Sequence, residues 1–79
     1  MKWVYLLDSI SHPGQTYRGL SDDPDRRLQE HNEGKVPSTA PFQPWRIRVA
    51  IRFADTVRAV AFERYLKSGS GHSFSKRHF

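Results

Sequence analysis

The chain has 79 residues, a net charge of +5 at pH 7 and no cysteine. A chain of this length corresponds to one domain, residues 1–79, and the lack of cysteine excludes disulfide bridges and thiolate zinc sites. Hydrophobic residues make up 37% and charged residues 27% of the chain, which is typical of a folded globular protein rather than a disordered one.

The N-terminal stretch MKWVYLLDS contains one lysine and a short apolar run. The run is too short for a transmembrane helix, and no small-residue cleavage site of a signal peptide follows it. We therefore expect a soluble, cytoplasmic protein with no membrane partner. Residues 2–8 are rich in aromatic and branched side chains and predict a buried strand that ends at Asp8.

A second short strand is predicted at residues 16–20, TYRGL. Pro13 and Gly14 lie between the two strands and are typical of a turn. Two short strands joined in this way favour an antiparallel hairpin.

Both ends of a helix are indicated within residues 21–34. Asp23 can cap the helix, and Pro24 suits its first position because the missing N–H would have no partner there. Gly34 can adopt the left-handed conformation that closes a helix. Residues 35–45 contain three prolines and predict a loop.

A strand with alternating character is predicted at residues 45–53, WRIRVAIRF. Alternation predicts a half-buried strand with a basic outer face. The apolar face would carry Trp45, Ile47, Val49 and Ile51, and the other face Arg46, Arg48, Ala50 and Arg52.

The clearest helical pattern covers residues 54–69, with Asp55 as its cap. Its predicted apolar stripe consists of Val57, Ala61 and Tyr65, widened by Ala59, Phe62 and Leu66. Gly69 and Gly71 are expected to end the helix, and residues 72–79 either add a helical turn or fray. The pattern ββαβα(α) predicts an α+β domain with a small, mostly antiparallel sheet.

Polar residues of the first helix allow two interpretations. Arg27 and His31 are four residues apart and share one face, which could look over the sheet toward Tyr17. The alternative is a solvated face with ordinary ion pairs, such as Arg26 with Glu30, and spacing alone favours it.

The role of a lone carboxylate in the later helix also allows two interpretations. Glu63 borders the apolar arc and could hold a divalent metal, but Lys67 lies four residues on, and spacing favours that ion pair. Tyr5 and Tyr17 lie on the paired strands, where packing is the default role of tyrosine. Alternatively, both hydroxyls point into one cleft.

The order of these segments resembles the GIY-YIG nuclease superfamily, and most closely its small single-domain members. The resemblance runs from VYLL through YRG, DPDRRLQEHN and PW to AFERYLK, over residues 3–67. It implies a three-stranded antiparallel sheet flanked by helices. The first motif here lacks its glycine, the second has Arg18 in its middle position, and Leu20 follows. An asparagine that some members place after the glutamate helix has no evident equivalent.

A set of catalytic residues follows from the resemblance: Tyr5, Tyr17, Arg27, His31 and Glu63. Glu63 would hold one Mg²⁺ or Mn²⁺, and Arg27 would pair with phosphate oxygens. Either tyrosine would orient or deprotonate the attacking water, and His31 would share the base role or hold a tyrosine hydroxyl. The candidate contacts to the nucleic-acid backbone are Arg18, Arg46, Arg48, Arg52, Lys76 and Arg77.

The resemblance and the positive charge together predict a metal-dependent endonuclease that acts on nucleic acid, with DNA favoured over RNA. Loose or structure-directed cleavage, as in repair, is expected rather than recognition of a long sequence, and we expect a monomer. The alternative is a non-catalytic nucleic-acid-binding module with the same fold. Glu63 separates the two, because binding alone needs no metal carboxylate.

Overall fold

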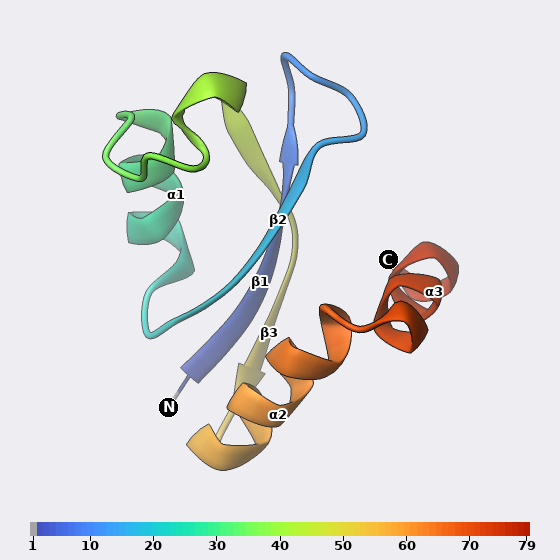
Figure 1. The fold of residues 1–79 in the computed structure, drawn as a ribbon. Coiled ribbons are helices and arrows are strands. Elements are labelled where there is room, and N and C mark those ends of the chain that lie inside the picture. The colour runs from blue at the N-terminus through green and yellow to red at the C-terminus, as the bar shows by residue number, and fades with distance from the viewer. Residues whose placement is uncertain (1) are drawn as a thin grey trace.

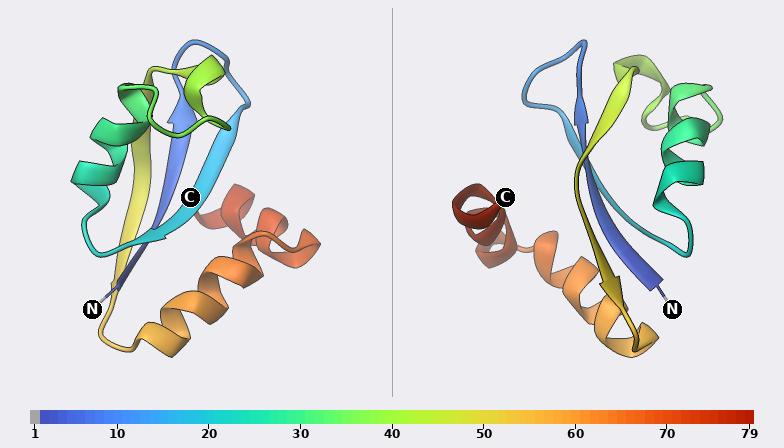
Figure 2. Two further views of the ribbon diagram at one scale, coloured as in Figure 1. Left: turned by 60° about the vertical axis from the view of Figure 1, so that its left-hand side comes forward. Right: turned by 180° about the vertical axis from the view of Figure 1, so that it is seen from behind.

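The computed structural model describes residues 2–79 and has the predicted α+β architecture (Figure 1). In chain order the elements are β1 (Lys2–Ser9), β2 (Thr16–Ser21), α1 (Pro24–Asn32), the 3-10 helix η1 (Ala40–Phe42), β3 (Trp45–Phe53), α2 (Thr56–Leu66) and α3 (Gly69–His78). The strands form one antiparallel sheet in the order β2-β1-β3. Helix α1 covers one face of this sheet, and α2 and α3 cover the other (Figure 2).

The central strand β1 is buried on both faces, which explains its unbroken apolar run. Val4 and Leu6 pack with Ala59 and other residues beneath α2 and α3. Tyr5 and Leu7 point the opposite way and pack with residues around α1. We call these two sides of the sheet the α1 face and the α2/α3 face.

The prediction of one apolar and one basic face for β3 is wrong. Leu6 pairs with Val49 but Leu7 pairs with Ile47, so that β3 carries one extra residue, Arg48, at a bulge. A bulge of this kind reverses the alternation of the strand. Val49 therefore packs on the α2/α3 face, whereas Ile47 and Ala50 pack with Tyr5 on the α1 face.

Helix α1 has the predicted ends. The Asp23 carboxylate accepts a hydrogen bond of 3.1 Å from the Arg26 N–H, and Pro24 is the first helical residue. Gly34 has a φ of 75°, in the left-handed region. Asn32 then joins the helix to β3, because its side chain accepts from the Trp45 N–H at 2.6 Å and donates to the Trp45 carbonyl at 3.0 Å.

The predicted apolar stripe on α2 is wrong, whereas part of its predicted extension is buried. Asp55 caps the helix as expected, and Ala59 and Leu66 are buried. Val57 and Tyr65, however, are 76% and 41% exposed, and Ala61 is exposed as well. The sheet contacts the arc that contains Ala59 and Leu66, and periodicity could not decide which part of a wide apolar arc would be covered.

The C-terminal segment forms a complete helix, α3, rather than a single turn. Helix α2 ends at Leu66, and the glycines expected to stop it begin α3 instead. Gly71 is required there, since a Cβ would overlap the backbone of Tyr65 and Leu66. Within residues 2–79, no helix has the length and apolar character needed to cross a membrane.

Candidate active site

Strand pairing places the two tyrosines on the α1 face. Tyr5 lies opposite Gly19, and Tyr17 is two residues from Gly19 on the same face of β2. The ring centroids of the tyrosines are 6.2 Å apart. A Cβ at Gly19 would lie only 2.5 Å from Cζ and Oη of Tyr5. The Tyr5 ring can therefore lie across β2 only because residue 19 has no side chain.

His31 joins this pair from α1 and is completely buried. Its ring centroid is 4.7 Å from that of Tyr17, and its Nε2 atom is 3.2 Å from the Tyr5 hydroxyl oxygen. On the other side of the ring, Nδ1 is 2.7 Å from Oγ1 of Thr39. The helix face that spacing alone assigned to solvent thus contributes a core residue to a cluster of aromatic rings.

The hydrogen bonds around Thr39 indicate which tautomer His31 adopts. The Thr39 hydroxyl donates to the Val36 carbonyl at 3.3 Å, so that it accepts from Nδ1–H of His31. Nε2 then carries a lone pair and accepts from the Tyr5 hydroxyl. Burial lowers the pKa of His31, and the positive charge of Arg27 lowers it further, which keeps the imidazole neutral near pH 7.

Arg27 lies at the more exposed side of the cluster. Its Nη1 donates to Oε1 of Glu30 at 2.7 Å, and its side chain is 33% exposed. Burial raises the pKa of Tyr5 above its ordinary value, and the neighbouring Arg27 guanidinium opposes that rise. Tyr5 is therefore a protonated hydrogen-bond donor at neutral pH, beside a cation that favours its phenolate.

Glu63 lies on α2, which packs against the opposite face of the sheet from α1 (Figure 2). Its side chain is only 16% exposed, and Oε2 forms an ion pair of 2.8 Å with Lys67, as spacing had favoured. The structure thus brings Tyr5, Tyr17, Arg27 and His31 together. The approach of Glu63 to those four residues stays a prediction.

The chemistry of Glu63 is compatible with a magnesium ion. Among residues 2–79, no group of three or more His, Asp or Glu side chains is arranged to hold a metal. That excludes a closed zinc site in this part of the chain but suits Mg²⁺, which commonly keeps several waters and takes one or two carboxylates. A metal bound at Oε2 of Glu63 would compete with Lys67 for that oxygen.

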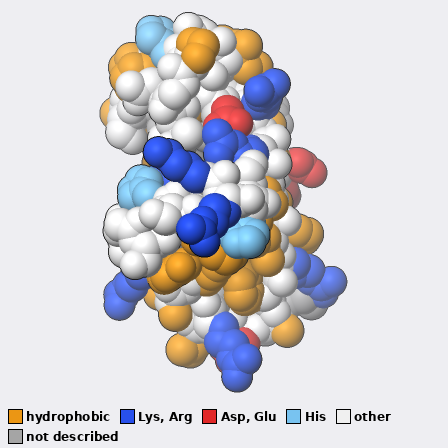
Figure 3. Space-filling model, turned by 90° about the vertical axis from the view of Figure 1, so that its right-hand side faces the viewer, with side chains coloured by type: hydrophobic (Ala, Val, Ile, Leu, Met, Phe, Trp, Pro, Cys, Tyr) orange, Lys and Arg blue, Asp and Glu red, His pale blue; other side chains and the backbone are white. Residues whose placement is uncertain are grey.

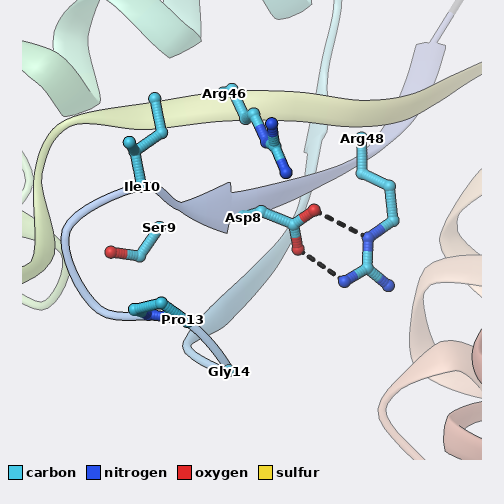
Figure 4. A pocket seen from close by; sticks show the side chains of 7 residues that line it. All are labelled: Asp8, Ser9, Ile10, Pro13, Gly14, Arg46 and Arg48. Carbon is cyan, nitrogen blue, oxygen red and sulfur yellow. Dashed lines mark hydrogen bonds and ion pairs between the residues drawn. The ribbon is translucent and has the colours of Figure 1, made fainter.

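The six basic residues expected to contact nucleic acid do not form one surface. Arg18, Arg48 and Lys76 line one groove on the α2/α3 face, and Arg46 lines an adjoining pocket with Asp8 and Arg48 (Figure 4). Figure 3 shows Lys and Arg side chains gathered on this side of the molecule. Arg77 borders a separate groove on α3, and Arg52 lies near the end of β3.

Sequence reasoning missed two contributors to the site. Thr39, which orients His31, lies in a proline-rich loop with no periodic signal. Glu30 pairs with Arg27, and their spacing of three residues could have revealed it. The ion pair expected between Arg26 and Glu30 is absent because Arg26 instead binds Asp22 at 3.0 Å.

Comparison with known proteins identifies the family to which the chain belongs. The family model described as the GIY-YIG catalytic domain matches residues 1–77. Similar proteins include the structure-specific endonuclease subunit SLX1 of Candida dubliniensis, 34% identical over 95% of this chain and 27% of that protein. The SLX1 proteins of Scheffersomyces stipitis and Malassezia globosa are 38% and 41% identical over 95% and 75% of this chain.

This chain covers only 22% of the S. stipitis protein and 14% of the M. globosa protein. It thus spans about a quarter, or less, of the length of the relatives it matches. The match nevertheless extends over nearly all of this chain and includes both tyrosine-bearing strands, α1 and α2. The chain therefore belongs to the GIY-YIG catalytic domain family.

Proposed function

We propose that this domain is a metal-dependent endonuclease that hydrolyses phosphodiester bonds in branched or nicked DNA, as in repair. Membership of a catalytic-domain family supports an enzyme, and the relatives are named structure-specific endonuclease subunits. The observation that carries the chemistry is the buried chain of hydrogen bonds from Tyr5 through His31 to Thr39. Such a chain offers a path for the proton that an attacking water must lose.

We propose Tyr5, rather than Tyr17, as the group that receives that proton, because its hydroxyl contacts His31. As water attacks phosphorus, its proton passes to the Tyr5 oxygen while the Tyr5 proton moves to His31 Nε2, 3.2 Å away. The water becomes the attacking hydroxide and His31 becomes an imidazolium. Since burial lowers the pKa of His31, the imidazolium gives up its proton readily, which suits a transient acceptor.

Arg27 and Tyr17 would act on the phosphate and the water. Arg27 has N–H groups besides the one that binds Glu30, and its planar fork suits the non-bridging oxygens. Tyr17 lies beside His31 and would orient the water. Glu63 would hold the Mg²⁺ or Mn²⁺, which when bound neutralises phosphate charge and stabilises the leaving oxygen.

One observation favours a second candidate, a nucleic-acid-binding module without catalysis. Lys67 already neutralises Glu63 through an ion pair of 2.8 Å. If that pair keeps Mg²⁺ away from Glu63, the metal has no protein carboxylate and only the basic surface remains functional. DNA binding without cleavage is the expected behaviour of such a module.

The monomer expected from the sequence has no independent support. The relatives are named as subunits, and each of them is several times longer than this chain. We therefore include a partner protein in the proposal. Measuring the molecular mass of the protein in solution, with and without candidate partners, would test it.

The test is cleavage of labelled branched, nicked and linear DNA with and without Mn²⁺. Tyr5→Phe removes the hydroxyl of the proposed relay, and Tyr65→Phe is the matched control on the exposed side of α2. We expect metal-dependent cleavage that is lost in the first variant and kept in the second. Wild-type protein that binds these DNAs but cuts none of them would favour the binding module.

A further inference from the structure

The α2/α3 face carries a basic groove that the proposed catalysis does not use. The groove measures about 330 Å³, and its lining includes Arg18 from β2, Arg48 from β3 and three α3 residues, His72, Ser75 and Lys76. Arg18 precedes Gly19 and follows Tyr17, so strand alternation points it away from the catalytic cluster. Asp8 offsets the charge of Arg48 through two hydrogen bonds of 2.8 and 2.6 Å (Figure 4).

Two buried polar atoms at this groove lack a partner. Nε of Arg18 and Oγ of Ser75 are inaccessible to solvent and form no hydrogen bond within the described part of the chain. Both residues line the groove. Leaving a buried donor unpaired is costly, and a charged donor more so. Neither atom is explained by the packing of the domain alone.

The surroundings of Arg18 favour an anion. Nη2 of Arg18 is 3.2 Å from Nδ1 of His72, and because a guanidinium only donates, the His72 proton lies on Nε2. Burial lowers the pKa of Arg18, and the charge of Arg48 lowers it further. Lys76 adds a third cation. An anion in the groove would relieve the repulsion between these cations.

We propose that the groove lined by Arg18, Arg48, His72, Ser75 and Lys76 binds a backbone phosphate of a second nucleic-acid segment. This inference rests on the proposed function, because the anion class follows from a nucleic-acid substrate. A phosphate suits the site since Arg18 and Lys76 supply positive charge and His72 can donate an N–H from the ring nitrogen that does not contact Arg18. The segment that it holds is distinct from the strand at Tyr5 and Tyr17.

The edge position of β2 would allow two segments to bind at once. β2 is an edge strand of the sheet, with Tyr17 on one face and Arg18 on the other. Nucleic acid that reaches both faces must pass around this edge. A branched molecule can place one arm on each side of β2, whereas a straight duplex meets one face at a time. The groove would therefore contribute to selection of branched DNA.

The first measurement is DNA binding at several salt concentrations in EDTA, where cleavage does not interfere. Arg18→Gln and Lys76→Gln each remove one groove cation, and Arg58→Gln removes an 83% exposed arginine elsewhere as the control. For a branched DNA, the slope of log K against log salt should shrink by about 1 in each groove variant. The loss of affinity should be smaller for a linear duplex of equal length.

The second measurement is titration of the wild-type protein with inorganic phosphate, followed by NMR of the arginine Nε–H groups. The Arg18 signal should shift and saturate, while the Arg58 signal stays in place. This readout keeps the proposal testable if Arg18→Gln fails to fold.

Groove variants that bind branched DNA as Arg58→Gln does, or an Arg18 signal unmoved by phosphate, would overturn the proposal. Failure of the nuclease function would show differently, as an uncut substrate whose binding still depends on the groove.

Discussion

Replacing Gly19 with alanine should disturb the cluster of Tyr5, Tyr17 and His31 more than the addition of one methyl group suggests. The new Cβ would lie 2.5 Å from both Cζ and Oη of Tyr5, whereas ordinary contact begins at 3.4 Å. The ring must therefore withdraw by about 0.9 Å, the difference between those two distances. Because Tyr5 is fully buried on the central strand, that movement strains its neighbours and displaces the hydroxyl from His31.

This displacement should lower both the stability of the protein and its rate of cleavage. Overpacking of a core typically costs about 1–3 kcal/mol, and for a domain of this size each kcal/mol lowers Tm by roughly 4–8 °C. A misplacement of about 1 Å in an active site can reduce the rate on the order of 100-fold. Thermal unfolding and single-turnover cleavage of branched DNA would measure the two effects.

Gly69→Ala is the matched control, since a Cβ there meets nothing within 4 Å. It should leave cleavage unchanged and be neutral or slightly stabilising, because alanine favours a helix over glycine. In a Tyr5→Phe background, Gly19→Ala should still destabilise the protein, because the new Cβ still lies 2.5 Å from Cζ of the ring after the hydroxyl is removed. A Gly19→Ala protein with wild-type cleavage and Tm would refute the assigned position of the Tyr5 ring.

Three further outcomes are expected. The Glu63→Gln variant should lose cleavage yet bind DNA as well as the wild type or slightly more tightly. The Arg27→Ala variant should lose cleavage and bind DNA more weakly. If circular dichroism shows that Glu63→Gln is unfolded, Glu63 has a structural role instead. Thr39→Val should leave the Nδ1–H of His31 without an acceptor. The free energy of unfolding in urea should fall by about 1–3 kcal/mol, and the pH profile of cleavage should change. An unchanged pH profile would contradict the assignment of the His31 proton to Nδ1. Burial lowers the pKa of His31 in the folded protein, so the unfolded chain takes up a proton first as the pH falls. The free energy of unfolding should therefore decrease as the pH drops below about 6.5. A free energy of unfolding that stays constant between pH 8 and 5 would argue against a neutral buried imidazole.

Local rules predicted the parts of this fold that depend on neighbours in sequence. Asp23, Pro24 and Gly34 define the ends of α1 through backbone hydrogen bonds and φ angles that involve only a few adjacent residues. The order of the motifs also sufficed to identify the family. The identities of the catalytic candidates came with that resemblance, because motif order connects them without any knowledge of distance.

Tertiary structure alone decided which side chains face one another. The bulge at Arg48 reverses the faces of β3, and it arises from pairing with β1, more than 35 residues away in sequence. His31 looked like part of a solvated helix until the sheet and Thr39 enclosed it. The groove around Arg18 joins two strands and a helix that no local pattern connects. Burial and hydrogen-bond partners are properties of the assembled core, because they depend on segments that meet only after the strands have paired.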